Sequence, residues 1–200
     1  MILRPRYLAA AVFAAASSPA IAFAHHAMDG ETPRTIWQAA LSGLAHPIIG
    51  WDHAAFVLAV GLLSAILDAR SAPAWFVAGT IAGSVLHVAG VSLPGVEILI
   101  AGTVVGAGIA VAAARSDARI PVAAVLAAAG VLHGYAYGES IIGAEPGPLA
   151  AYLLGFGAVQ LVIATGAAVA YRRSSRVRAV RGVAGGGLAL VGCFAIWLAV

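Results

Sequence analysis

The stretch that decides the fold is His46-Pro47-Ile48-Ile49-Gly50-Trp51-Asp52-His53, where two imidazoles and a carboxylate stand at the start of a long apolar run. An ionisable side chain inside a membrane-spanning segment costs about 3 kcal/mol or more, so it marks a candidate functional site by default. Imidazole and carboxylate groups are also ligands that divalent transition metals favour. The stretch therefore predicts a membrane protein that binds a metal ion.

The composition of the whole chain agrees with a membrane protein. Of its 200 residues, 62% are hydrophobic and 10% are charged, whereas soluble domains carry about 25% charged residues. The net charge of +3 depends on arginine, because the chain has no lysine, and the arginines stand between apolar runs. This pattern indicates a lipid bilayer rather than nucleic acid as the partner. The single cysteine, Cys193, excludes an intrachain disulfide.

The first residues have the features of a secretory signal peptide. A positively charged start and a short apolar centre precede Ala22-Phe23-Ala24, which fits the small-x-small cleavage site. We expect residues 1–24 to be a cleaved signal peptide, with an uncleaved anchor as the alternative. The mature chain, residues 25–200, would then form one membrane domain for metal transport. Cleavage would place His25 and His26 beside a free amine, where they are candidate weak metal ligands.

Six apolar runs of near-spanning length follow the first motif or begin within it, since a membrane helix needs about 20 residues. They cover residues 50–68, 73–91, 95–114, 119–138, 148–171 and 182–200. The sequence thus predicts an all-α, polytopic membrane bundle of six transmembrane helices after the signal peptide. The segment 36–45 is too short to span, and we expect it to lie at the outer surface or to dip into the membrane.

Glycine spacing predicts close packing between some of these helices, because small residues four apart let helix backbones approach. The pairs and triplets are Gly79/Gly83, Gly102/Gly106, Gly130/Gly134/Gly138 and Gly182/Gly186.

Arginine sets the expected orientation. With six spans, the mature chain has only Arg34 on one side, and all its other arginines fall in turns on the opposite side. These are Arg70, Arg115, Arg119, Arg172, Arg173, Arg176, Arg178 and Arg181. The positive-inside rule then predicts a multi-pass protein of the bacterial inner membrane whose mature amino terminus is periplasmic.

This orientation places the first motif at the outer end of the first span. A straight helix would separate His46 from His53 by about 10 Å along its axis, which is too far for one ion. Pro47 and Gly50 predict a bend that brings His46 back toward His53 and Asp52. A helix cap with interfacial histidines is the alternative interpretation.

A second constellation, His133-Gly134-Tyr135-Ala136-Tyr137-Gly138-Glu139, falls near the outer end of the fourth span. Tyr137 stands one turn after His133 and can share its face, although tyrosine also favours the membrane interface for its own sake. His87 and Glu97 approach the same side. A satisfied core histidine and a helix-start carboxylate explain these two better than metal ligation does.

Together the two motifs resemble the HupE/UreJ family of small bacterial membrane proteins, which accompany hydrogenases or ureases and are regarded as nickel or cobalt permeases. The resemblance covers nearly all of the mature chain, including the turn Leu93-Pro94-Gly95-Val96-Glu97. It implies six spans and the import of Ni²⁺ or a similar ion. The ligand candidates that it implies are His46, Asp52, His53, His133 and Glu139.

The expected function is therefore secondary uptake of a divalent metal ion. The chain has no GxxxxGK[ST] phosphate loop, so we expect no ATP hydrolysis by the chain itself. An inside-negative potential favours entry of a dication by about 4.6 kcal/mol per 100 mV. Imidazole and carboxylate suit Ni²⁺, Co²⁺ or Zn²⁺ better than Cu(I). We expect no enzymatic activity and no permanent cofactor, and the sequence does not predict the oligomeric state.

Other classes stay open. A non-transporting accessory could deliver metal to a hydrogenase or urease, and its partner would be the maturation machinery of that enzyme. A zinc-dependent intramembrane hydrolase could use three histidines and an aspartate with one open position for water, although no HExxH motif occurs. A haem-binding cytochrome would need two histidines that face each other at one depth.

Overall fold

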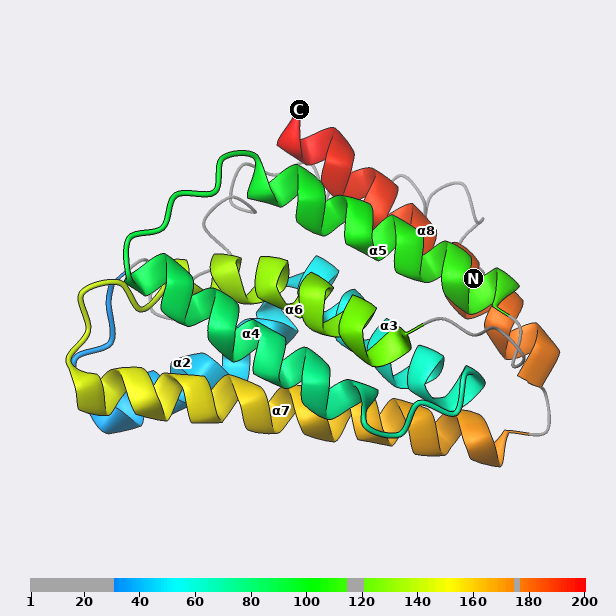
Figure 1. Ribbon diagram of the computed structural model, residues 1–200, viewed down its shortest axis with the longest axis horizontal. Coiled ribbons are helices and arrows are strands. Elements are labelled where there is room, and N and C mark those ends of the chain that lie inside the picture. Colours follow the sequence, from blue (N-terminus) through cyan, green and yellow to red (C-terminus); the bar gives the residue numbers. More distant parts are fainter. Residues whose placement is uncertain (1–30, 115–120, 175–176) are drawn as a thin grey trace, which may run out of the picture.

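A computed structural model describes residues 31–114, 121–174 and 177–200. These residues form seven helices and no strand (Figure 1). The helices are α2 (Ile36–Ile49), α3 (Trp51–Ile66), α4 (Ala72–Val88), α5 (Val96–Ala113), α6 (Val122–Glu139), α7 (Pro146–Arg173) and α8 (Val177–Ala199). The all-α prediction is confirmed. The predicted signal peptide, with His25 and His26, lies outside the described residues.

A helix occupies each of the six segments predicted to span a membrane. In the described part of the chain, three helical stretches are long and apolar enough to cross alone: Val96–Ala113, Pro146–Arg173 and Ala179–Ala199. The bent pair α2 and α3 would make a fourth crossing, and α4 is apolar but shorter. The described part of the chain is thus all-helical with three candidate membrane spans, and the number of six crossings stays a prediction.

The bend that Pro47 and Gly50 predicted is present. Thr35 starts α2 with a capping box, since its side chain accepts a hydrogen bond from the Gln38 backbone and the Gln38 side chain returns to the Thr35 backbone. The helix ends where Gly50 N donates to His46 O at 3.2 Å. From Gly50 the chain restarts as α3, and the two helix axes differ in direction by 79°.

The short helix α2 packs along the first half of α7 (Figure 1). Ile36 lies near Gly147, and Gly43 lies against the backbone of Tyr152 and Phe156. The two helices α2 and α7 therefore run in the same direction along their contact. This packing supports the expectation that the segment dips into the bundle rather than lying across its end.

Glycines do hold two helix pairs together, but only some of the predicted ones take part. Gly79 and Gly83 of α4 face the backbone of α6, and Gly130, Gly134 and Gly138 of α6 face α4 in return. Around Gly102, Gly106, Gly182 and Gly186 there is open space instead. The α5–α8 pair is formed by other glycines: Gly108, Gly185 and Gly192.

The described arginines of the turns gather at one end of the bundle, where α3, α5 and α7 finish. Arg172 donates to Ser64 O at 3.4 Å and lies 3.8 Å from Asp68 Oδ1. Arg181 donates to Val111 O at 3.1 Å and so caps the last turn of α5. The arrangement agrees with the arginine grouping that the sequence predicts.

Candidate metal centre

His46 lies in the last turn of α2 and points into the protein, with 3% of its surface exposed. Its Nδ1 lies 3.3 Å from the Ser140 hydroxyl oxygen, just after the end of α6. Its ring meets the rings of Tyr137 and Tyr152 edge-on, at centroid distances of 4.9 and 6.1 Å. Three helices thus enclose this imidazole.

His53 stands in the first turn of α3, on the other side of the helix break. Its ring centroid is 6.0 Å from that of His46, closer than the separation of about 10 Å that a straight helix would give. Gly50 makes room for the ring, because a Cβ at this position would lie 2.5 Å from His53 Cδ2. The break therefore both turns the chain and lets the two histidines approach.

His133 of α6 completes a cluster of three imidazoles. It is fully buried, and its Nδ1 lies 3.0 Å from Nδ1 of His53. Phe56 stacks against it at a centroid distance of 4.3 Å. Two nitrogens that bind one ion at right angles, each about 2.1 Å from it, would lie about 3.0 Å apart. The two nitrogens are at hydrogen-bonding distance from each other, and an ion that replaced this hydrogen bond could bind both with little change in their separation.

The hydroxyl of Thr103 on α5 lies within hydrogen-bonding distance of His133 and favours one tautomer of its ring. The Thr103 hydroxyl donates to Ile100 O at 2.6 Å, and its oxygen lies 2.9 Å from His133 Nε2. Because the hydroxyl hydrogen is already used, the oxygen accepts from Nε2–H. In the neutral ring Nδ1 then keeps its lone pair, and this lone pair faces His53. Partners of this kind orient metal-binding histidines in many sites.

Tyr137 packs against the other two imidazoles. Its fully buried ring lies 4.9 Å from His46 and 4.7 Å from His53, edge-on in both cases. The Tyr152 hydroxyl donates to Tyr137 O at 2.8 Å and so ties α7 to α6 at this level. The sequence prediction that Tyr137 shares a face with His133 agrees with this placement.

Asp52 stands at the edge of the cluster and is half-buried. Its Oδ1 accepts a hydrogen bond of 2.9 Å from the backbone N–H of His53 in the first turn of α3. A carboxylate at a helix start is stabilised by the exposed backbone donors there. Asp52 thus fixes the beginning of α3 and brings a negative charge next to the imidazoles.

Three predicted candidates lie apart from the imidazole cluster. Glu139 and Glu97 are exposed, at the end of α6 and the start of α5. His87 stacks on Tyr135 at 4.1 Å, and its Nδ1 lies 2.6 Å from Tyr135 O. His87 is therefore satisfied within the α4–α6 contact, and Glu97 occupies a helix start.

In residues 31–114, 121–174 and 177–200, no three His, Cys, Asp or Glu side chains are arranged as a ready set of metal ligands. The three imidazoles are neighbours, but their ring nitrogens do not all point toward one position that an ion could occupy. Small rotations of the rings would be needed to direct His46, His53 and His133 at one ion.

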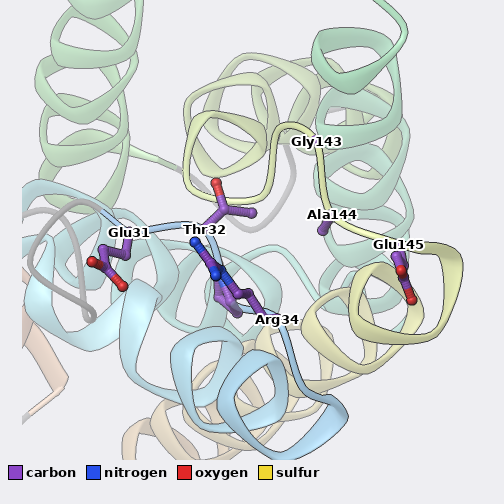
Figure 2. Close-up of a pocket in the computed structure, with 7 residues that line it drawn as sticks. Glu31, Thr32, Arg34, Gly143, Ala144 and Glu145 are labelled. Carbon is purple, nitrogen blue, oxygen red and sulfur yellow. The ribbon is translucent and has the colours of Figure 1, made fainter.

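A pocket of about 420 Å³ opens next to this region. It is formed by the segment that leads into α2 and by the turn after Ser140, which contacts His46. Figure 2 shows Thr32 and Arg34 between the carboxylates of Glu31 and Glu145. The Thr32 hydroxyl donates to Ile142 O at 3.1 Å and joins the two sides of the pocket.

Thr103 and Ser140 are the contributors that the sequence did not reveal. Ser140 directly follows the second constellation, but its hydroxyl gave no signal of its own, and Thr103 is a single hydroxyl residue in an apolar run. Thr103 comes from a helix that carries no motif residue except Glu97. Only the packing of α5 against α6 brings it to His133.

Comparison with known proteins agrees with the motif resemblance. The family model described as HupE / UreJ protein matches residues 12–195. The chain belongs to the HupE/UreJ family. It is 32% identical over 187 residues to Protein HupE of Rhizobium leguminosarum bv. viciae, an alignment that covers 90% of this chain and 92% of that protein. No solved structure matches the chain. The resemblance to HupE/UreJ proteins is thus confirmed over nearly the whole sequence.

Proposed function

We propose that this HupE/UreJ protein carries a divalent transition-metal ion, Ni²⁺ or Co²⁺ in the first place, across the bacterial inner membrane without hydrolysing ATP. The observation that carries the proposal is the convergence of His46, His53 and His133 from α2, α3 and α6 in a buried cluster. Burying imidazoles inside a membrane protein costs free energy, so such a cluster marks a candidate functional site. Imidazole is also a ligand that suits these ions.

Entry begins at the pocket between the segment before α2 and the turn after α6. The charged residues that line this pocket are the carboxylates of Glu31 and Glu145 and the guanidinium of Arg34, so its net charge is negative, and negative charge raises the local concentration of cations. Ser140 joins the turn to His46. The ion thus moves from an open, hydrated vestibule to the imidazoles, where ring nitrogens replace part of its water shell.

The helix break supports binding in two ways. Non-helical backbone at membrane depth is tolerated where it is buried in protein or lines a wet cavity. The break lets His46 and His53 turn independently, because they belong to helices whose axes differ by 79°. The carboxyl end of α2 also directs its partial negative charge toward the site, which favours a cation.

The membrane potential supplies the driving force. A dication that crosses 100 mV with the inside negative gains about 4.6 kcal/mol, equivalent to more than a thousandfold accumulation. No separate energy source is required for uptake on this scale. Directed uptake requires that the pocket face the periplasm and that the arginine-rich end face the cytoplasm, as the positive-inside rule expects.

Reconstitution tests the proposal. The purified full-length protein in liposomes with an inside-negative potential should accumulate Ni²⁺, and His53→Ala should abolish this accumulation. His87→Ala is the matched control, because His87 is bonded within the α4–α6 contact. Ni²⁺ binding without accumulation would favour the non-transporting accessory instead. Equal accumulation by wild type and His53→Ala would exclude the proposed site.

A further inference from the structure

An open groove of about 560 Å³ follows the outward face of α7, in the half of the helix that leads to the arginine-rich end. The residues that line it run from Leu161 to Arg173. Val162 is 70% exposed and Leu161 is 43% exposed. Gly166 keeps the middle of the groove open, because a Cβ at this position would have no heavy atom within 4 Å. In the described part of the chain, no other helix covers this middle section.

The groove combines an apolar length with a single charge at one end. Its lining is apolar except for the hydroxyl of Thr165 and the guanidinium of Arg173. Arg173 is exposed and is the last residue of α7. A guanidinium binds a phosphate group through paired, charge-assisted hydrogen bonds. A ligand that matches the groove is therefore apolar along most of its length and carries a phosphate at one end.

The position of the groove along α7 matches one leaflet of a bilayer. The helix has 28 residues and is one of the candidate membrane spans. It is about 42 Å long, whereas the hydrocarbon core is about 30 Å thick. Arg173 therefore lies at the level of the lipid headgroups when α7 crosses the membrane. Leu161 stands about 18 Å before it along the axis, close to the roughly 15 Å of one leaflet.

The sequence around the end of α7 adds positive charge at this level. Residues 172–181 contain five arginines and no Asp or Glu. Clusters of basic residues directly after a membrane helix attract anionic lipids. Arg172 and Arg181 donate to backbone carbonyls of α3 and α5, whereas Arg173 lines the groove. Arg173 is thus the guanidinium that is placed to meet a headgroup.

We propose that the second half of α7 binds one anionic phospholipid from the leaflet at the arginine-rich end. One acyl chain lies in the groove over Gly166, and the headgroup phosphate pairs with Arg173. A lipid that binds the folded chain also stabilises it by mass action. The site is separate from the imidazole cluster, and its existence does not depend on the proposed uptake of metal ions.

Lipid binding to the purified full-length protein tests this site. Native mass spectrometry compares phosphatidylglycerol with phosphatidylcholine of the same acyl chains, and thermal melting in detergent is followed with each lipid. Wild type should bind phosphatidylglycerol about fivefold more tightly, the effect of one arginine on an anionic headgroup. It should also melt at higher temperature with phosphatidylglycerol than with phosphatidylcholine.

Two substitutions separate the headgroup contact from the acyl-chain contact. Arg173→Gln should lower the affinity for phosphatidylglycerol about fivefold and leave that for phosphatidylcholine unchanged. Gly166→Leu, which fills the groove, should weaken the binding of both lipids. The matched controls are Arg70→Gln, which removes another exposed arginine at the same end, and Gly106→Leu, which adds the same side chain at a glycine facing open space on α5. Neither control should change lipid binding.

The other outcomes would overturn the proposal. Equal affinity of wild type for the two lipids, or of wild type and Arg173→Gln for phosphatidylglycerol, would show that no headgroup binds Arg173. An equal loss in Gly106→Leu and Gly166→Leu would mean that lipids cover the apolar surface without a distinct site. A two-chain species that Gly166→Leu separates, with lipid binding unchanged, would assign the groove to a second copy of the chain.

Discussion

At the scale of single residues, the hydroxyl of Thr103 controls the chemistry of His133. It accepts from Nε2–H because its own hydrogen bonds Ile100 O at 2.6 Å. Without that acceptor the two tautomers of the neutral ring would become closer in energy, and the ring could turn away from His53. Thr103 would thus control the tautomer and the orientation of His133 without binding the ion itself.

Thr103→Val should therefore weaken metal binding while the protein stays folded. Loss of a partner that orients a metal ligand typically costs about 10–100-fold in affinity, and we expect a Ni²⁺ dissociation constant raised by this factor in calorimetric titration. Thr165→Val is the control, since Thr165 is exposed on the outward face of α7. Equal affinities for the two variants would show that Thr103 does not orient His133.

Asp52 combines a structural and an electrostatic role, and one substitution separates them. Asp52→Asn keeps an oxygen that can accept from His53 N but removes the negative charge. We expect an unchanged melting temperature and a Ni²⁺ affinity lowered about tenfold, equivalent to about 1.4 kcal/mol. Asp68→Asn changes a carboxylate at the arginine-rich end and should leave affinity unchanged. A fall in melting temperature without loss of affinity would make Asp52 purely structural.

At the scale of helices, Gly50 between α2 and α3 has no side chain and so leaves room for the His53 ring. Gly50→Ala would place a methyl group against the His53 ring and move the imidazole away from His133. Sites of this kind tolerate errors of only about 0.5 Å, so Ni²⁺ binding should be lost or strongly weakened. Gly102→Ala, which meets open space, should bind normally. Normal binding by Gly50→Ala would mean that the break does not position His53.

The α4–α6 contact makes a separate prediction about stability. A methyl group at Gly79 would collide with the backbone of Ala127, whereas one at Gly106 would have no heavy atom within 4 Å. Gly79→Ala should lower the free energy of unfolding by about 1–3 kcal/mol. Gly106→Ala should leave it unchanged or raise it, because alanine favours helix. Thermal melting in detergent compares the two, and equal melting temperatures would contradict tight packing at Gly79.

The helices could be predicted from sequence much better than their contacts. Apolar runs between polar turns located α3 to α8, and Pro47 with Gly50 indicated the bend before α3. Glycine spacing predicted close packing at glycines of α4 and of α6, which do face each other, but it also predicted it at Gly102 and Gly106, which face open space. The spacing of glycines shows which face of a helix lacks side chains. It does not show which other helix packs against that face. Thr103 was missed for the same reason, because its partner His133 lies on another helix.

At the scale of the whole molecule, the imidazole cluster and the described arginines of the turns lie at opposite ends of the bundle. The imidazole cluster and the pocket between Glu31 and Glu145 lie where α6 ends and α7 begins. Arg172 and Arg181 bind backbone carbonyls at the other end. The positive-inside rule assigns the arginine end to the cytoplasm, so the metal would be collected outside and released inside.

Cysteine labelling tests this orientation. In a Cys193→Ser background, Glu145→Cys and Arg70→Cys each place one thiol at an exposed position at opposite ends of the bundle. In intact spheroplasts free of inverted vesicles, a membrane-impermeant maleimide should label Glu145→Cys. It should label Arg70→Cys only after the membrane is permeabilised. The reverse pattern would place the pocket in the cytoplasm and make uptake through the proposed route untenable.

The central claim is that imidazoles from α2, α3 and α6 bind the same dication. Nickel K-edge X-ray absorption on the purified, Ni²⁺-loaded protein measures this most directly. We predict imidazole scattering in the ligand shell, with nickel–nitrogen distances of about 2.1 Å, that weakens in His46→Ala, His53→Ala and His133→Ala alike. An all-oxygen shell, or a wild-type spectrum that none of the three substitutions changes, would contradict the account.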